Sequence, residues 1–275
     1  MSSRRLLRPS RVRRSQEGKL VAEYVTINNV RSWYDTEGEG EPLVLLHGGF
    51  SDSRDFDGNL RKLAEKFKVY LLDRRGHGHT PDVDGPVSID MLVDDVVAFI
   101  EEVVGGPAYL AGYSSGGFVA LAVASRRPDL VRKLVLVSTA YAPEGWLFLP
   151  EPDGQMPQQL VDRYAEVSPD GGDHFPVVVR KFAEMELDAA VDPGALASPT
   201  LILVGDDDMI HLRHIVDMYE AVPDAQLGIV PAATHLMLFE RPDLVTRLVD
   251  EFLTTEPVLL MPVRRPGGIL AQQQR

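Results

Sequence analysis

The sequence predicts an α/β protein whose mostly parallel sheet is covered by helices on both faces. Short apolar runs alternate along the chain with longer segments of helical periodicity, as they do in folds built from β-α-β units. The apolar runs also lack the regular polar positions of a strand with one solvated face, and strands buried on both faces are typical of parallel sheets. The 275 residues contain no evident linker or internal repeat, so we expect one core domain.

The first elements are expected to be two strands joined by a tight turn. Residues 24–27 and 30–34 are rich in β-branched and aromatic side chains, and they flank Asn28-Asn29, which is a hairpin signal. Apolar runs then predict strands at 43–46, 69–72 and 108–111. Helical periodicity predicts helices at 55–66 and 88–104.

The second half of the chain continues this alternation. A helix of small residues is expected at 116–124, and strands are expected at 134–137, 200–204 and 226–230. A helix near 212–221 separates the last two strands. The final helix, at 242–253, begins with Pro242, because proline is favoured in the first turn of a helix.

The alternation breaks between residues 138 and 198, where we expect an insertion. Its entry is rich in proline and glycine, and a short helix near 158–167 and a longer one near 175–187 follow. The α/β core is therefore expected in two parts, at 20–137 and 199–255, with the insertion at 138–198 between them.

Both ends of the chain differ from the core in composition. Residues 1–19 carry seven basic side chains and one acidic side chain, and residues 256–275 are rich in proline and glycine. The pair Arg4-Arg5 is similar to a twin-arginine signal, but no apolar segment follows it. We expect a disordered basic arm at 1–19 and a tail at 256–275, with no chemistry in either.

Composition excludes several classes of protein. The net charge is −13 at neutral pH, and an acidic protein is poorly suited to bind nucleic acid or an anionic membrane. The sequence contains no cysteine, which excludes a disulfide framework and thiol chemistry. No run reaches the roughly 18 apolar residues of a transmembrane helix. We expect a cytoplasmic monomer or homodimer with no nucleic-acid or membrane partner.

The pattern Gly-x-Ser-x-Gly at residues 112–116 stands between a predicted strand and a predicted helix. A strand that turns directly into a helix through this pattern is typical of a nucleophile elbow. The turn is so tight that the positions two residues from the serine must lack bulk, and Gly117 lets the helix pack close to the sheet. Ser114 is therefore a candidate nucleophile, exposed at the positive end of a helix.

A serine hydroxyl needs a base to accept its proton, so a histidine and an acid are expected further along the chain. Three aspartates, Asp206, Asp207 and Asp208, follow one predicted strand, and His235 follows the next. Asp206 directly follows its strand and is placed to bond turn amides, whereas Asp208 can reach over the sheet edge. Geometry favours Asp208 and leaves the other two open.

These motifs, in this order along the chain, resemble the α/β-hydrolase superfamily, and the resemblance runs from about residue 23 to residue 253. It implies the α/β-hydrolase fold and makes the insertion a helical cap. Family members usually have Gly-x-x-Asp after the strand that carries the acid, which from Gly205 selects Asp208. The resemblance thus implies Ser114, Asp208 and His235 as the catalytic residues.

Residues 47–50, His-Gly-Gly-Phe, follow an apolar strand and are similar to the family's His-Gly-x segment. The resemblance implies an oxyanion hole made by the backbone N–H groups of Gly49, or Phe50 in its place, and Ser115. Two fixed N–H dipoles stabilise the negative charge of a tetrahedral intermediate, and one such donor is typically worth about 3–4 kcal/mol of the barrier. The block 73–80 resembles the family's Asp-x-Arg-Gly-x-Gly-x-Ser segment, which is structural.

The longer helix expected in the insertion carries an apolar stripe. Its members are Phe175, Val178, Val179, Phe182 and Met185. Such a stripe either packs the insertion onto the core or faces a substrate cavity. For the second interpretation, the candidate substrate-binding residues are Phe50, Trp146 and Phe182, with a small apolar acyl molecule as the partner.

Two groups of residues could suggest a metal site. Asp206, Asp207 and Asp208 lie in a row, whereas calcium loops separate their ligands and contain a turn glycine. His77 and His79 have no third ligand in sight, so we expect solvated loop histidines. No metal and no cofactor is expected.

Three functions are compatible with these residues. The first is hydrolysis of a carboxylic ester, lactone or thioester through an acyl-serine. The second uses the same residues for C–C hydrolysis or for a perhydrolase (cofactor-free haloperoxidase) reaction, although meta-cleavage C–C hydrolases usually have a longer glycine-rich oxyanion loop. The third is a ligand-sensing binding protein. Dehalogenases and epoxide hydrolases are similar but use aspartate at the elbow, so Ser114 argues against both.

Overall fold

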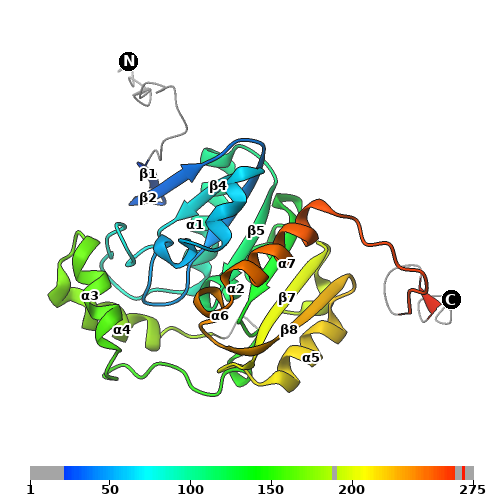
Figure 1. The fold of residues 1–275 in the computed structure, drawn as a ribbon. Helices are drawn as coiled ribbons and strands as arrows, with labels where there is room; N and C mark the ends of the chain where they lie inside the picture. The colour runs from blue at the N-terminus through cyan, green and yellow to red at the C-terminus, as the bar shows by residue number, and fades with distance from the viewer. Residues whose placement is uncertain (1–21, 188–190, 264–267, 270–275) are drawn as a thin grey trace, which may run out of the picture.

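The computed structural model describes residues 22–187, 191–263 and 268–269, and within these residues one eight-stranded sheet forms the centre of the molecule (Figure 1). Its strands run in the order β1-β2-β4-β3-β5-β6-β7-β8. They are β1 (Glu23–Ile27), β2 (Val30–Glu37), β3 (Glu41–Leu46), β4 (Phe67–Leu72), β5 (Ala108–Tyr113), β6 (Val131–Val137), β7 (Thr200–Asp207) and β8 (Ala225–Thr234). Strands β3 to β8 are parallel, and only the β1–β2 and β2–β4 pairs are antiparallel. The predicted fold class is confirmed.

Helices cover both faces of this sheet (Figure 1). One face packs against α1 (Ile89–Phe99), α2 (Ser115–Arg126) and α5 (Leu212–Ala221). The other face packs against α6 (Met237–Glu240) and α7 (Pro242–Thr254). Two further helices, α3 (Gln158–Val167) and α4 (Phe175–Ala183), stand beside the sheet rather than on it (Figure 1).

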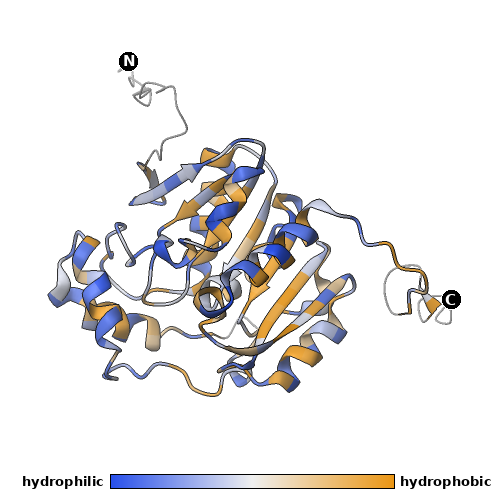
Figure 2. Cartoon of the chain, viewed as in Figure 1, coloured by the Kyte–Doolittle hydropathy of each residue, from blue (hydrophilic) through white to orange (hydrophobic). Residues whose placement is uncertain are grey.

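The strands in the centre of the sheet are mostly apolar because both of their faces are buried. In β3, Leu43 and Leu45 join the core beneath α7, whereas Val44 and Leu46 join the core beneath α1 and α2. None of these four side chains is exposed to solvent, and burial of each contributes about 1.5–3 kcal/mol. Much of the central strands is accordingly orange, the hydrophobic colour, in Figure 2.

The predicted hairpin is present between β1 and β2. Ile27 pairs with Val30, and the two residues between them, Asn28 and Asn29, have φ of 48° and 66°. Two consecutive left-handed residues are what a type I′ turn requires, and asparagine tolerates this region better than most side chains.

The α-helix predicted at 55–66 is wrong. Two 3₁₀ turns, Ser53–Phe56 and Leu60–Glu65, occupy this region instead. Gly58 between them has a φ of +77°, which ends the first turn, and the Asn59 side chain accepts the Leu60 N–H and so starts the second. Local polar bonding prevents a continuous helix here.

Other predicted helices differ at their ends. Helix α1 begins after its cap Ser88 as expected, but a π-helical turn at Ile100–Val104 replaces its last turn. Helix α4 ends at Ala183 rather than at residue 187. Helices α3 and α5 lie at 158–167 and 212–221 as predicted, and the short α6 was not predicted.

Within the insertion, α3 and α4 pack on each other through the buried side chains of Tyr164, Phe175, Val178 and Val179. The basic arm at 1–19 lies outside the described residues. Of the tail, residues 256–263 and 268–269 are described, and Val258 and Leu260 in it are exposed.

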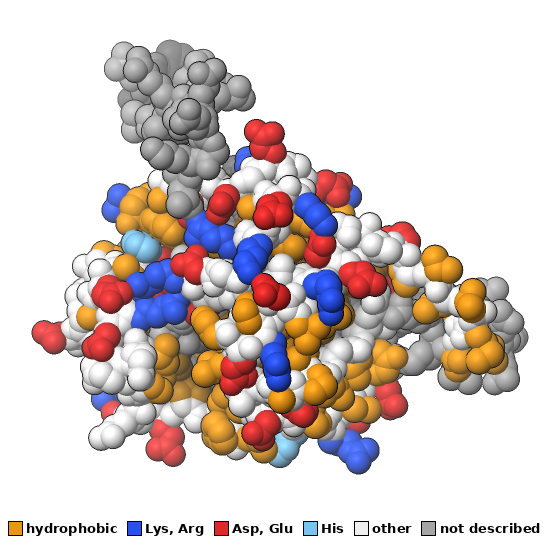
Figure 3. Space-filling model, in the orientation of Figure 1, with side chains coloured by type: hydrophobic (Ala, Val, Ile, Leu, Met, Phe, Trp, Pro, Cys, Tyr) orange, Lys and Arg blue, Asp and Glu red, His pale blue; other side chains and the backbone are white. Residues whose placement is uncertain are grey.

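Acidic and basic side chains are interspersed over the face shown in Figure 3. Among the residues that the structure describes, none of the helices is long and apolar enough to cross a membrane.

Candidate active site

Ser114 lies in a strained turn between β5 and α2. Its φ of 54° and ψ of −124° are rare for a residue with a side chain. A Cβ added to Gly112 would overlap the backbone of Gly116, and one added to Gly116 would overlap the carbonyl oxygens of Leu46 and His47. Both positions therefore require glycine, and the turn presents Ser114 in front of the first turn of α2.

His235 connects Ser114 to Asp208. His235 Nε2 lies 2.9 Å from Ser114 Oγ, and His235 Nδ1 lies 2.8 Å from Asp208 Oδ1. The structure brings these three predicted residues into one hydrogen-bonded chain. Because an ionised carboxylate only accepts, Nδ1 carries the hydrogen and Nε2 accepts the hydrogen bond from the Ser114 hydroxyl.

Three donors hold the carboxylate of Asp208. Besides His235, the hydroxyl of Ser138 donates to Oδ2 at 2.7 Å and the N–H of Gly205 donates to Oδ2 at 3.2 Å. Burial alone raises the pKa of Asp208, but these hydrogen bonds and the His235 imidazole outweigh it and bring the pKa below its ordinary value. The carboxylate is ionised and ready to stabilise an imidazolium.

The other two aspartates lie elsewhere. Asp206 Oδ1 accepts the N–H of Ala233 at 3.1 Å, which ties the last residues of β8 to the end of β7. Hydrogen bonds from the backbone of these β8 residues lower the pKa of Asp206. The side chain of Asp207 is exposed. Neither residue bonds to His235.

The oxyanion candidates lie beside Ser114. Gly49 and Ser115 both line the same cavity as Ser114, and a Cβ added to Gly49 would lie 3.3 Å from Ser115 Oγ. Phe50, the alternative donor, has a φ of 59°, so the loop is strained at the residue after Gly49.

His47 orders the loop that carries Gly49. The N–H of Arg74 donates to His47 Nε2 at 3.0 Å, so the ring hydrogen is on Nδ1, which donates to the Gly48 carbonyl at 2.7 Å. Complete burial lowers the pKa of His47 well below its ordinary value, and the nearby Arg74 guanidinium lowers it further. His47 is a neutral structural residue.

A cavity of about 630 Å³ opens in front of Ser114. Its wall is mostly apolar and includes the three candidate binding residues Phe50, Trp146 and Phe182. The apolar stripe of the insertion is divided between the two predicted roles, because Phe175, Val178 and Val179 are buried between α3 and α4. Phe182 and Met185 line the cavity instead.

The expectation of a solvated His77 is wrong. His77 is 1% exposed, and its ring packs edge-on against Phe182 at 4.6 Å between centroids. Burial lowers the pKa of His77 to about 3, so the ring is neutral and forms part of the floor beneath the insertion.

Sequence reasoning missed three residues around the site. Ser138 follows β6 and bonds Asp208, Tyr113 donates its hydroxyl to the His235 carbonyl at 2.9 Å, and Arg74 contacts the oxyanion loop. Ser138 and Arg74 make these contacts across neighbouring strands, whereas Tyr113 at the end of β5 reaches the residue after β8, with β6 and β7 between them in the sheet. Only the strand order could have revealed them.

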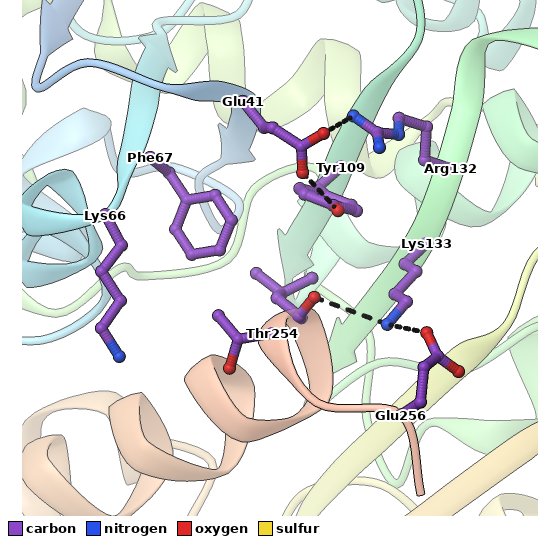
Figure 4. A pocket seen from close by; sticks show the side chains of 9 residues that line it. Glu41, Lys66, Phe67, Tyr109, Arg132, Lys133, Thr254 and Glu256 are labelled. Carbon is purple, nitrogen blue, oxygen red and sulfur yellow. Dashed lines mark hydrogen bonds and ion pairs between the residues drawn. The ribbon is translucent and has the colours of Figure 1, made fainter.

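A second cavity, of about 550 Å³, lies at the opposite ends of the strands (Figure 4). Its charged groups already have partners: Glu41 contacts Arg132 at 2.6 Å and Tyr109 at 2.8 Å, and Lys133 contacts Glu256 at 3.2 Å. The described residues of its wall include neither a serine nor a histidine, and we do not take this cavity as a candidate active site.

A family model described as the alpha/beta hydrolase family matches residues 43–248. An (E)-2-((N-methylformamido)methylene)succinate hydrolase from Acinetobacter baylyi is 24% identical over 254 residues, which cover 84% of this chain and 97% of that protein.

Two known structures share the fold. The enol-lactonase from Burkholderia xenovorans LB400 has a TM-score of 0.68 and 24% identity, over 85% of this chain and 100% of that one. A thermophilic esterase from Thermogutta terrifontis has a TM-score of 0.71 and 23% identity, over 85% of this chain and 98% of that one.

Proposed function

Because the chain belongs to the alpha/beta hydrolase family, we propose that it is a serine hydrolase that cleaves a carboxylic ester, lactone or thioester through an acyl-serine. The observation that carries this proposal is the hydrogen-bonded chain from Ser114 through His235 to Asp208, with distances of 2.9 and 2.8 Å. The esterase and lactonase among the similar structures support the same class of substrate.

In the first half of the reaction, His235 Nε2 takes the proton of Ser114 as Oγ attacks the carbonyl carbon. The charge that develops on the carbonyl oxygen is held by the N–H groups of Gly49 and Ser115. Asp208 stabilises the imidazolium that forms on His235. The intermediate collapses, His235 gives its proton to the leaving oxygen or sulfur, and the acyl group remains on Ser114.

In the second half, His235 takes a proton from water, and the resulting hydroxide attacks the acyl-serine. The second tetrahedral intermediate uses the same two N–H groups. Its collapse releases the carboxylic acid, and His235 returns the proton to Ser114 Oγ. No group other than the chain's own residues and water is needed for atoms and charges to balance.

The substrate is a small molecule with an apolar acyl part. Phe50, Trp146 and Phe182 are in position to contact it, because each lines the cavity in front of Ser114. A cavity of about 630 Å³ is of the size that takes a ligand rather than a polymer chain.

A substrate panel tests this proposal against C–C hydrolysis, which uses the same residues. We expect hydrolysis of p-nitrophenyl acetate, butyrate and hexanoate and no cleavage of a vinylogous diketone. Ser114→Ala should lower kcat on the esters by roughly 10³-fold or more. Cleavage of the diketone with no ester hydrolysis would contradict the proposed reaction and assign C–C hydrolysis instead. Ser114→Ala with near wild-type kcat would remove Ser114 as the nucleophile.

A further inference from the structure

Arg74 is buried at the wall of the cavity, directly after β4, and neither the proposed reaction nor the family motif gives it a role. It occupies the variable position of the block 73–80, and its side chain lines the cavity together with Gly49 and Ser115. Only 4% of Arg74 is exposed. A large charged side chain is rarely buried to this extent without a specific reason.

The guanidinium joins the two segments that provide the proposed oxyanion hole. Nη2 of Arg74 donates to the carbonyl oxygens of His47 at 2.8 Å and Gly48 at 3.1 Å in the loop after β3. The same atom donates to Ser115 Oγ at 2.9 Å in the first turn of α2. Gly49 and Ser115 belong to these two segments, and Arg74 is a direct bridge between them.

The contact with Gly48 fixes the direction of the Gly49 N–H. The Gly48 carbonyl and the Gly49 N–H belong to one trans peptide, so they point in opposite directions. Arg74 Nη2 and His47 Nδ1 both donate to this carbonyl, which sets the peptide plane and therefore the aim of the N–H. A cation on the carbonyl also polarises the peptide and strengthens its N–H as a donor.

The charge of Arg74 is not neutralised at close range. Among the described residues no carboxylate forms an ion pair with it, and its Nε has no hydrogen-bond partner. Burial lowers the pKa of Arg74 to about 10, while Asp55 and Asp73 oppose this shift. The adjacent Arg75 differs, because its guanidinium donates to both oxygens of Asp95 at 2.6 and 2.7 Å.

We propose that Arg74 is a positioning residue of the oxyanion hole, which aligns the Gly49 and Ser115 N–H groups and leaves its positive charge available to a developing oxyanion. This inference rests on the proposed serine hydrolysis. An unpaired buried cation is unfavourable in the resting protein, and a negative charge that appears during the reaction compensates it. Arg74 therefore acts on the transition state more than on bound substrate.

The test compares Arg74→Met and Arg74→Lys with the wild type on p-nitrophenyl butyrate. We expect Arg74→Met to lower kcat by about 10–10²-fold with KM changed less than about threefold. Misaligned N–H donors still stabilise the oxyanion in part, so the loss of kcat is smaller than the loss caused by deleting a donor. Arg74→Lys retains the positive charge but not the planar guanidinium with its several N–H donors. Its kcat should lie between those of Arg74→Met and the wild type. The affinity for a trifluoromethyl ketone, whose adduct carries the oxyanion, should fall in parallel with kcat/KM.

Arg75→Lys is the matched control, because it makes the same change at the neighbouring buried arginine. It weakens the pair with Asp95, so it should lower the unfolding temperature while kcat and the ketone affinity of the folded enzyme stay within about twofold. Should Arg74→Met not fold, Arg74→Lys and the ketone affinity still decide the outcome.

A double-mutant cycle with Ser115→Ala tests the bridge itself. Ser115→Ala removes the oxygen that Arg74 contacts but keeps the backbone N–H. The loss of kcat caused by Arg74→Met should be smaller in the Ser115→Ala background than in the wild type. Additive losses would show that Arg74 does not act through Ser115.

The failure of this inference is distinguishable from failure of the proposed function. Labelling of the wild type by a fluorophosphonate, which requires an activated serine, tests the serine hydrolase itself. If the wild type reacts and both Arg74 variants react at its rate with unchanged ketone affinity, the positioning role is overturned. The positioning role would also be overturned if the Arg74 variants lost activity only in proportion to their loss of folded protein.

Discussion

His235 bonds two residues that lie 27 and 121 positions before it in the sequence. One ring nitrogen donates to Asp208 and the other accepts from Ser114, so the acid determines which nitrogen is the base. Three donors to Asp208 keep its carboxylate charged in a buried position, and two of them come from the backbone of Gly205 and the hydroxyl of Ser138.

Single aspartate-to-asparagine changes test the assignment of the acid. Asp208→Asn should lower kcat by about 10²–10⁴-fold with the fold intact, because an amide can hold the wrong tautomer of His235. Asp206→Asn and Asp207→Asn are matched controls and should remain within a few-fold of wild type. If Asp208→Asn kept near wild-type kcat and Asp206→Asn lost most of its kcat, Asp206 rather than Asp208 would be the catalytic acid.

Asp55 gives a pH dependence of stability. Burial raises the pKa of this carboxyl to about 6, although it accepts hydrogen bonds from Ser51 at 2.5 Å and from the Gly48 N–H at 3.0 Å. The folded protein therefore binds this proton more strongly than the unfolded chain does. The contribution of Asp55 to the free energy of unfolding is greatest below about pH 4 and decreases as the pH rises through 6.

Asp55→Asn removes this titration. The stability of the variant relative to wild type should increase between pH 4 and pH 7, by up to about 3 kcal/mol, and then stay constant. Urea unfolding of the variant and of the wild type at a series of pH values measures this difference. A difference that is constant from pH 4 to pH 8 would contradict the raised pKa.

At the scale of elements, α4 divides its apolar stripe between packing and the cavity. Phe175 is 2% exposed in the contact with α3, whereas Phe182 lies against Phe50 and His77 at the cavity wall. The two phenylalanines belong to one helix, so they form a matched pair for substitution by alanine.

Phe182→Ala should change the preference among acyl chain lengths more than it changes kcat on the acetate ester. One methylene typically discriminates by about 1–3 kcal/mol in an apolar pocket. Phe175→Ala should instead lower the unfolding temperature, because a buried phenylalanine typically contributes about 3–5 kcal/mol, and leave the chain-length preference unchanged. An equal loss on every ester for Phe182→Ala would assign this residue to packing.

The elements also show what sequence could and could not predict. The apolar strands and the helices at 158–167 and 212–221 were predictable because a single periodicity and clear ends define them. The helix predicted at 55–66 failed because the left-handed Gly58 and the side chain of Asn59 favour two short turns. The order of apolar residues along the sequence indicates helical periodicity, but it does not indicate these local polar hydrogen bonds.

At the scale of the whole molecule, the strand order assembles the site. Four neighbouring strands each end just before one residue of the site. Ser114 follows β5, Ser138 follows β6, Asp208 follows β7 and His235 follows β8. Parallel strands deliver their carboxyl ends to the same edge, where sites of α/β folds lie. Motif spacing predicted the three residues of the hydrogen-bonded chain, whereas Ser138 and Arg74 depend on which strands are neighbours.

Ser114 is expected to be a nucleophile that His235 activates. Intact-mass measurement after treatment with a fluorophosphonate probe, followed by mapping of the labelled peptide, tests it without knowledge of the natural substrate. We expect one adduct, on Ser114, that is absent in Ser114→Ala and forms far more slowly in His235→Ala. An adduct on another residue, or a wild-type protein that remains unlabelled while folded, would contradict it.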